Sequence, residues 1–94
     1  MSSQTVAFKL VIEGRVQGVS FRASMKRAAD QFGISGWVAN LPDGNVEALV
    51  RGSKEDVEQI INWSKKGPPR ARVDRLSVEE TSADLDIFGF RILR

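Results

Sequence analysis

The sequence predicts an α+β sandwich in which two helices cover one face of an antiparallel sheet. Segments with alternating apolar residues are interrupted twice by segments in which apolar residues recur with helical spacing. The chain has 94 residues, which is enough for one hydrophobic core and no second lobe. The turn signal Pro-Asp-Gly at residues 42–44 joins two of the alternating segments, as expected of antiparallel neighbours.

The first half of the chain supplies a strand, a loop and a helix. Residues 6–13 alternate with period two, which is typical of a half-buried strand. A polar loop bracketed by glycines follows over residues 14–20, and helical spacing then continues over residues 21–32 until Gly33 ends the helix. The residues expected to face the core are Phe8, Leu10 and Ile12 in the strand, and Phe21, Met25, Ala28, Ala29 and Phe32 in the helix.

The second half supplies a hairpin, a second helix and two further strands. Residues 34–41 and 45–51 are the strands on either side of the turn. Residues 53–56, Ser-Lys-Glu-Asp, resemble a capping box with Asp in place of the usual Glu or Gln, and they predict the start of the second helix. Gly-Pro-Pro at residues 67–69 ends that helix. The last two strands are predicted at residues 73–80 and 87–93, the second with core residues Phe88, Phe90 and Ile92.

This order, βαββαβ with an extra edge strand in the last third, is that of the ferredoxin-like sandwich. We expect one domain over residues 6–94, preceded by a flexible tail at residues 1–5. The tail has neither the basic start nor the apolar run of a signal peptide, and no apolar stretch exceeds three residues. These features predict a cytoplasmic protein that does not span a membrane.

The composition excludes several kinds of chemistry. The chain has no cysteine and no histidine, which excludes disulfides, thiolate and imidazole metal ligands, Ser-His-Asp triads and Cys-His pairs. Any catalysis has to use Arg, Lys, Asp, Glu, Asn, Gln, Ser, Thr or the backbone. With 14 basic and 12 acidic side chains, the net charge of +2 is too small for the electrostatic field of a typical nucleic-acid-binding protein.

The most informative segment runs from Gly14 to Arg22. Its two glycines allow the backbone to turn N–H groups inward, and a helix with unpaired N–H donors starts directly behind them. Such a loop binds anions, and Arg22 in the first helical turn can bind two oxygens of a phosphate. The alternative is a bent connection in which Arg22 pairs with a surface carboxylate. The spacing matches neither the dinucleotide-binding fingerprint nor the P-loop.

Asn40 is the second candidate for the same site. Strand alternation puts it on the same face as Val38, so if Val38 faces the core, Asn40 lies on the helix side near the end of its strand. A carboxamide there can hold a water molecule in line with a bound phosphorus atom. Alternatively, the Asn40 side chain satisfies backbone groups at the strand end.

Other side chains are weaker candidates. Ser20 could be a nucleophile, but no base is near it in the sequence, and a helix N-cap is the better interpretation. Arg15 either assists phosphate binding or only decorates the loop. A group of acidic residues could suggest a metal site but is better interpreted as a solvated turn: Glu79, Glu80, Asp84 and Asp86.

Two further patterns concern charge and aromatic residues. One stretch of the chain is rich in basic residues, which either form a solvated face or attract anionic substrates: Lys65, Lys66, Arg70, Arg72 and Arg75. Phe88-Gly89-Phe90 is similar to a fragment of the RNA-binding motif of RRM domains, but we interpret these phenylalanines as core residues. We expect Trp37 and Trp63 to serve packing rather than base stacking.

Several segments resemble the acylphosphatase family. Residues 14–22, Gly-Arg-Val-Gln-Gly-Val-Ser-Phe-Arg, are similar to its first signature, and residues 36–40, Gly-Trp-Val-Ala-Asn, are similar to its second. Residues 67–73 and 90–92 are also similar to segments typical of the family, so the resemblance runs from about Leu10 to the end of the chain.

The resemblance implies a ferredoxin-like fold and the hydrolysis of carboxyl-phosphate mixed anhydrides, with acetyl phosphate, carbamoyl phosphate and 1,3-bisphosphoglycerate as possible substrates. It implies that Arg22 binds the phosphate and that Asn40 orients the attacking water. The phosphate-binding loop would consist of Gly14, Arg15, Val16, Gln17, Gly18, Val19, Ser20 and Phe21. No cofactor or metal is expected, and the expected partners are an acyl phosphate and inorganic phosphate, with no membrane or nucleic acid; we expect a monomer.

Two hypotheses for the function follow. The leading one is a metal-independent acylphosphatase that uses the loop, Arg22 and Asn40. The alternative is a module of the same fold that binds an anion or a nucleic acid without turnover, because fold alone does not fix function.

Overall fold

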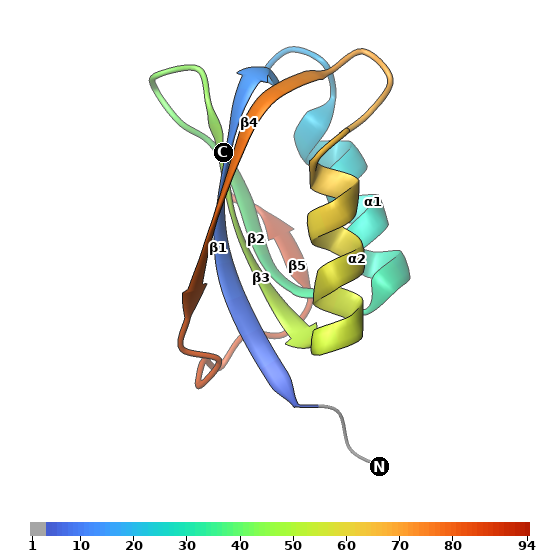
Figure 1. The fold of residues 1–94 in the computed structure, drawn as a ribbon, viewed down its shortest axis with the longest axis vertical. Helices are drawn as coiled ribbons and strands as arrows, with labels where there is room; N and C mark the ends of the chain where they lie inside the picture. Colours follow the sequence, from blue (N-terminus) through green and yellow to red (C-terminus); the bar gives the residue numbers. More distant parts are fainter. Residues whose placement is uncertain (1–3) are drawn as a thin grey trace.

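The computed structural model describes residues 4–94. One five-stranded sheet, in the order β4-β1-β3-β2-β5, carries both helices on the same face (Figure 1). The ferredoxin-like α+β sandwich predicted from the sequence is thereby confirmed. The elements are β1 (Thr5–Arg15), α1 (Phe21–Phe32), β2 (Ser35–Asn40), β3 (Val46–Ser53), α2 (Lys54–Ser64), β4 (Arg72–Thr81) and β5 (Phe90–Ile92).

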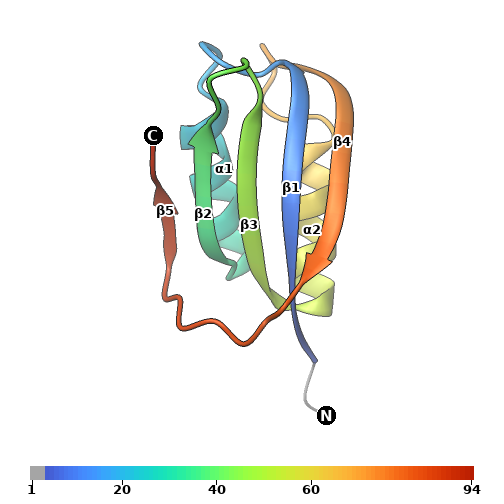
Figure 2. The same ribbon diagram turned by 90° about the vertical axis from the view of Figure 1, so that its left-hand side faces the viewer.

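The sheet is mixed, which corrects the prediction of an antiparallel sheet. β1 pairs antiparallel with β3 and β4, and β2 pairs antiparallel with β3, but β5 runs parallel to β2. Figure 2 shows the reason: after β4 the chain passes across the end of the sheet to the free edge of β2. β5 therefore begins at the same end of the sheet as β2 and runs in the same direction.

The core lies between the sheet and the helices. The alternating residues of β1 and the helical stripe of α1 behave as predicted, except that Phe8 and Phe32 are only partly buried. The predicted helix signals also hold. Gly33 ends α1 in a left-handed conformation with φ 72°, and the Ser53 hydroxyl caps α2 by accepting a hydrogen bond of 3.2 Å from the Asp56 amide. The fully buried side chains include Leu10, Ile12, Met25, Val57 and Ile60.

The last strand is shorter than predicted, and two of its three expected core residues are exposed. The strand covers only Phe90–Ile92, although the backbone of Gly89, Leu93 and Arg94 is also hydrogen-bonded to β2. Phe90 is buried, whereas Phe88 is 81% exposed and Ile92 is 42% exposed. Gly89 has φ 72°, a left-handed turn that breaks the alternation between Phe88 and Phe90. Ile92 belongs to an edge strand, so only one side of it has a strand neighbour.

The N-terminal boundary also differs from the prediction. Thr5, expected in a tail, is the first residue of β1 and is paired with Ser53, and the Gln4 carbonyl accepts a hydrogen bond of 3.2 Å from the Lys54 amide. The remaining part of the expected tail, residues 1–3, lies outside the described residues. Neither helix between residues 4 and 94 has the length and apolar character needed to cross a bilayer.

Candidate active site

The loop after β1 is shorter than predicted. Gly14 and Arg15, expected in the loop, form the end of β1, where they pair with Val73 and Arg72 of β4 after a register shift that follows Glu13. The connection to α1 therefore consists of residues 16–20.

This connection is fixed to the core at two points. The side chains of Val16 and Val19 are buried, and Gln17 and Gly18 lie between them. Gly18 and Ser20 both have left-handed backbones, with φ 74° and 63°. Left-handed residues within a turn direct successive N–H groups to one side, which creates a concave site for an anion.

α1 begins directly behind the loop. Ser20 occupies the N-cap position, but within residues 4–94 its hydroxyl makes no capping bond, so the expected cap exists in position only. The Ser24 amide is bonded to the Ser20 carbonyl at 3.0 Å, whereas the earlier amides of a helix have no partner within it. The positively polarised end of α1 is therefore open.

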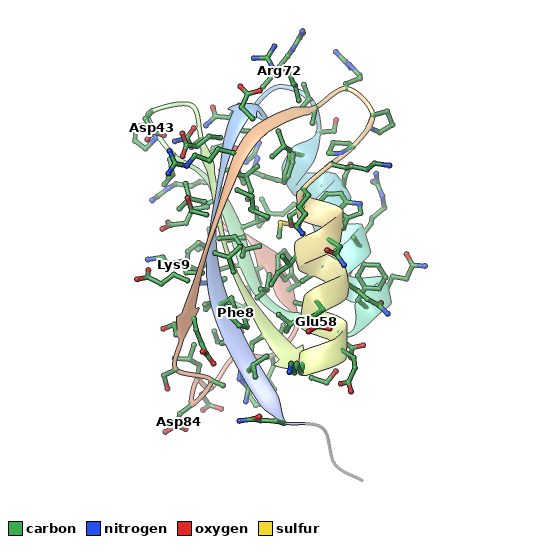
Figure 3. All side chains as sticks on the ribbon, viewed as in Figure 1. Phe8, Lys9, Asp43, Glu58, Arg72 and Asp84 are labelled. Carbon is green, nitrogen blue, oxygen red and sulfur yellow. The ribbon has the colours of Figure 1, made fainter. Side chains whose placement is uncertain are left out.

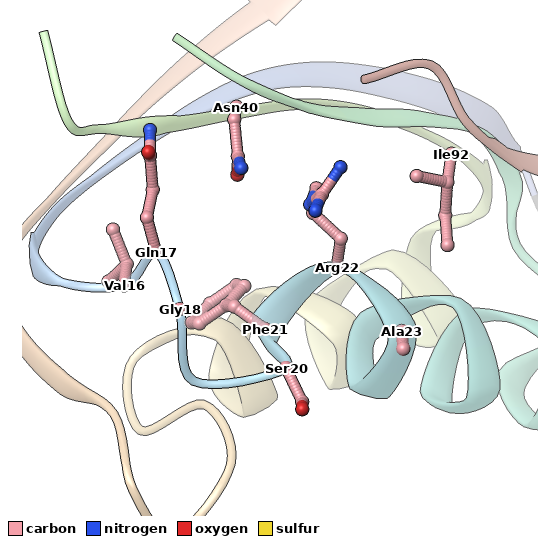
Figure 4. Close-up of a pocket in the computed structure, with 9 residues that line it drawn as sticks. All are labelled: Val16, Gln17, Gly18, Ser20, Phe21, Arg22, Ala23, Asn40 and Ile92. Atoms are coloured by element: carbon pink, nitrogen blue, oxygen red, sulfur yellow. The ribbon is translucent and has the colours of Figure 1, made fainter. Parts of the chain in front are cut away.

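Arg22 and Asn40 lie across one pocket from each other. Figure 4 shows the Arg22 side chain pointing from α1 and the Asn40 side chain pointing from the end of β2 into the same space. This confirms that Asn40 lies on the helix side of the sheet. The volume of the pocket is ≈ 460 Å³, within the range of small-molecule sites. Its lining residues are Val16, Gln17, Gly18, Ser20, Phe21, Arg22, Ala23, Asn40 and Ile92.

Arg22 does not take part in an ion pair of the described chain. The three ion pairs within residues 4–94 join Lys9 to Glu47, Lys26 to Asp30 and Arg72 to Asp74. Arg22 is a partly buried residue that lines the pocket, and no carboxylate of the described chain pairs with its guanidinium. Its fork of donors can therefore bind oxygen atoms of a ligand.

Asn40 combines a fixed backbone with an unpaired side-chain oxygen. The backbone N–H of Asn40 donates a hydrogen bond of 2.6 Å to the Arg94 carbonyl, and Asn40 pairs with Val46 of β3. The Oδ1 atom is buried and has no hydrogen-bond partner among residues 4–94. A buried acceptor without a partner is costly, so this oxygen is suited to a donor that a ligand or water brings into the pocket.

Gln17 has a side-chain role that the sequence analysis missed. Its Nε2 donates hydrogen bonds to the carbonyl oxygens of Leu41, at 2.8 Å, and Asn45, at 2.9 Å. These acceptors lie 24 and 28 residues further along the chain, so no local sequence signal points to the contact. Ile92 and Ala23, which also line the pocket, were not singled out either, although the predicted alternation put Ile92 on the inner face.

Comparisons with known proteins identify the family. The family model described as Acylphosphatase matches residues 8–92. The chain therefore belongs to the acylphosphatase family. An acylphosphatase of Thiobacillus denitrificans is 52% identical over 87% of this chain and 92% of its own length. Among solved structures, the acylphosphatase of Bacillus subtilis covers 95% of this chain and 99% of its own, with 32% identity and a TM-score of 0.91. The acylphosphatase of Coxiella burnetii covers 95% and 93%, with 32% identity and a TM-score of 0.90.

Membership of the acylphosphatase family supports hydrolysis of acyl phosphates as the class of reaction. Arg15, Val19 and the acidic candidates do not line the pocket, whereas Ser20 does. Arg15 is exposed at the end of β1 and does not line it, and the Val19 side chain belongs to the core. The acidic residues at positions 79, 80, 84 and 86 are exposed, and no group of three or more acidic side chains in residues 4–94 could hold a metal ion.

The aromatic residues of this acylphosphatase-family chain mostly serve packing. Phe90 is buried, and Trp63 packs edge-on against Phe21 with ring centroids 5.4 Å apart. Trp37 is partly buried on the opposite face of the sheet from Val38. Because it is buried, Phe90 is not available to stack on a base, whereas Phe88 is exposed and does not belong to the core as expected.

The basic stretch lies at the same end of the molecule as the pocket. The α2–β4 connection and the β1–α1 connection are neighbours in Figure 1, and Figure 3 places Arg72 at this end and Asp84 at the other. Arg72 is paired with Asp74 at 2.9 Å, and this hydrogen bond and the charge of Asp74 raise the pKa of Arg72 above its ordinary value. Lys65, Lys66 and Arg70 are exposed.

Proposed function

We propose that the chain hydrolyses the carboxyl–phosphate bond of small acyl phosphates in the pocket between Arg22 and Asn40, without a metal ion. The observation that carries the proposal is the arrangement of three kinds of group around one space: a guanidinium, a carboxamide and a loop of backbone amides. Each of these groups has a distinct task in phosphoryl transfer to water.

The phosphate binds to the loop and to Arg22. The amides of residues 17–21 and the positive end of α1 donate to its oxygens, while the guanidinium of Arg22 takes two of them. This arrangement neutralises the phosphate charge without any metal ligand. Donors aimed at a developing charge contribute about 3–4 kcal/mol each to a transition state.

The water binds to Asn40. Its buried Oδ1 accepts a hydrogen bond from the water, which turns a lone pair of the water oxygen toward phosphorus. The new O–P bond forms as the bond from phosphorus to the acyl oxygen breaks, and the carboxylate leaves with the electron pair. One proton of the water passes to a phosphate oxygen and the other stays on the new hydroxyl, so the products are a carboxylate and inorganic phosphate.

The leaving group explains how a chain without histidine can do this chemistry. A carboxylate is a weak base and departs without protonation, so no general acid is required. Binding of charge and placement of water are sufficient. The pocket offers groups for both tasks.

Two substitutions test these roles. With benzoyl phosphate and excess chelator, the parent protein is expected to release phosphate. Arg22→Ala should lower kcat/KM at least about a hundredfold because the phosphate loses its principal cation. Asn40→Ala should lower kcat by about a hundredfold or more, with little change in the inhibition constant of inorganic phosphate, because only the water is misplaced.

Arg27→Ala and Asn62→Ala are the matched controls, since both side chains are exposed on the helices and neither lines the pocket. Circular dichroism checks that all variants are folded. A parent-like rate in Arg22→Ala or Asn40→Ala would contradict the assigned roles. Binding of phosphate or single-stranded RNA by the parent without any phosphate release would instead indicate the non-catalytic module.

A further inference from the structure

The side chain of Gln17 links the anion-binding loop to the hairpin that carries Asn40. Figure 4 shows it extending from the loop to the sheet beside Asn40. Its two bonds, 2.8 Å to Leu41 and 2.9 Å to Asn45, use both hydrogens of the carboxamide nitrogen. A rotated carboxamide would set its oxygen against two carbonyl oxygens, so the bonds fix its orientation.

The two acceptors are the carbonyls that close the β2–β3 turn. The Leu41 amide donates to the Asn45 carbonyl at 2.8 Å, and the Gly44 amide donates to the Leu41 carbonyl at 3.2 Å. Asp43 further holds the turn by accepting from the Asn45 amide at 3.0 Å. Each closing carbonyl thus accepts one bond from the turn and one from Gln17. Gln17 therefore contacts a turn that is already ordered, and it can fix the position of that turn as a unit.

Asn40 directly precedes this turn, and its Oδ1 has no partner within the described residues. The position of this oxygen over the pocket therefore depends on the backbone of the hairpin. The Gln17 side chain thus bridges the loop that supplies the amides and the hairpin that carries Asn40.

We propose that Gln17 is a positioning residue, whose side chain holds the hairpin, and with it Asn40, in register with the anion-binding loop. This proposal rests on the proposed function. Gln17 acts on the water through Asn40, and its side chain is not required for binding the phosphate, for which its backbone amide remains available in any variant.

Gln17→Leu tests the proposal, since it puts an apolar side chain of slightly shorter reach at this position and removes both donated hydrogen bonds. We expect kcat to fall about 10- to 30-fold because Asn40 is displaced, while the inhibition constant of inorganic phosphate changes less than about threefold. The side-chain amide resonances of Asn40 in a ¹⁵N-labelled sample should shift or broaden. Gln59→Leu, the same change on the exposed face of α2, should leave all three measurements as in the parent.

A second variant, Gln17→Met, keeps more of the original volume and serves if Gln17→Leu does not fold. A parent-like kcat in the folded variant, or an unchanged Asn40 resonance, overturns the proposal. So does an inhibition constant that rises in parallel with the fall in kcat, because Gln17 would then serve the loop instead. A parent-like rate in Asn40→Ala would instead contradict the proposed function itself. Because that result comes from a different variant, the two failures can be distinguished.

Discussion

At the scale of single residues, the pocket is built from groups that the fold leaves unsatisfied. The Oδ1 of Asn40 is buried without a partner in the described chain, and the side chain of Arg22 takes no part in its three ion pairs. Most buried polar atoms in folded proteins are paired, so an unpaired one requires an explanation. A negatively charged ligand with a water beside it would satisfy both groups at once.

The backbone conformation of Ser20 destabilises the fold. Ser20 is the one non-glycine residue with positive φ in the described chain, and its hydroxyl does not cap the helix. A left-handed backbone costs a side-chain-bearing residue about 1–2 kcal/mol, which the added freedom of glycine in the unfolded state partly offsets. We therefore expect Ser20→Gly to stabilise the fold by about 0.5–1 kcal/mol in urea denaturation. The rate should stay within about twofold of the parent, because in the proposed function only the backbone amide of Ser20 binds the phosphate.

Ser24→Gly is the control for this prediction. Ser24 lies inside α1, where glycine costs about 0.5 kcal/mol relative to serine, so the same chemical change should have the opposite sign. If Ser20→Gly instead destabilised the fold, the serine side chain would have to contribute more to stability than its left-handed backbone costs.

At the scale of elements, the end of β1 decides where the loop begins. The register between β1 and β4 shifts between Glu13 and Gly14, and Gly14 has φ 133°. A Cβ atom on Gly14 would overlap the carbonyl oxygen of Arg72, which belongs to the backbone and cannot rotate away. β1 and β4 can therefore stay paired up to the pocket only if position 14 has no side chain.

Gly14→Ala should consequently destabilise the fold by at least about 2 kcal/mol, since both backbone strain and a backbone clash must be relieved. Gly89→Ala is the matched control. Gly89 also has positive φ, but beyond its own two chain neighbours no described residue lies within 4 Å of the point where its methyl group would sit, so only the strain of about 1 kcal/mol remains. Equal midpoints for the two variants in urea denaturation would contradict the conclusion that the nearby Arg72 carbonyl requires glycine at position 14.

The same elements show how far the sequence could predict the structure. The order of strands and helices follows from local periodicity, as does the position of Asn40 on the inner face. The parallel pairing of β5 and the exposure of Phe88 do not, because they depend on how the chain crosses the end of the sheet and on the left-handed turn at Gly89. The contacts of Gln17 could not be predicted from local sequence patterns either, because its acceptors belong to a hairpin that is distant in the sequence.

At the scale of the whole molecule, the topology explains why residues from two separate segments meet. β1 and β2 both run antiparallel to β3, which lies between them, so both strands finish at the same end of the sheet. The loop after β1, the start of α1 and Asn40 at the end of β2 are therefore gathered at one end (Figure 2). The β1–α1–β2 unit alone supplies Arg22, Asn40 and the amides of the loop.

The distribution of charge has a consequence for substrate capture. The net charge is only +2, but Lys65, Lys66 and Arg70 lie in the connection between α2 and β4, at the same end of the molecule as the pocket. Exposed charges act over about 30 Å at 10 mM salt and about 3 Å at 1 M. A positive potential at this end would raise the rate of encounter with a phosphate dianion without changing the chemical step.

We therefore expect kcat/KM to fall as ionic strength rises, with kcat nearly constant. Lys66→Glu should lower kcat/KM about two- to threefold at 10 mM salt, with the difference from the parent vanishing at high salt, because screening removes the contribution of the charge. Lys54→Glu carries the same charge change at the start of α2, the end of that helix away from the pocket, and should have a smaller effect at every salt concentration. Identical salt profiles for the two variants would mean that net charge, rather than its location beside the pocket, governs the encounter.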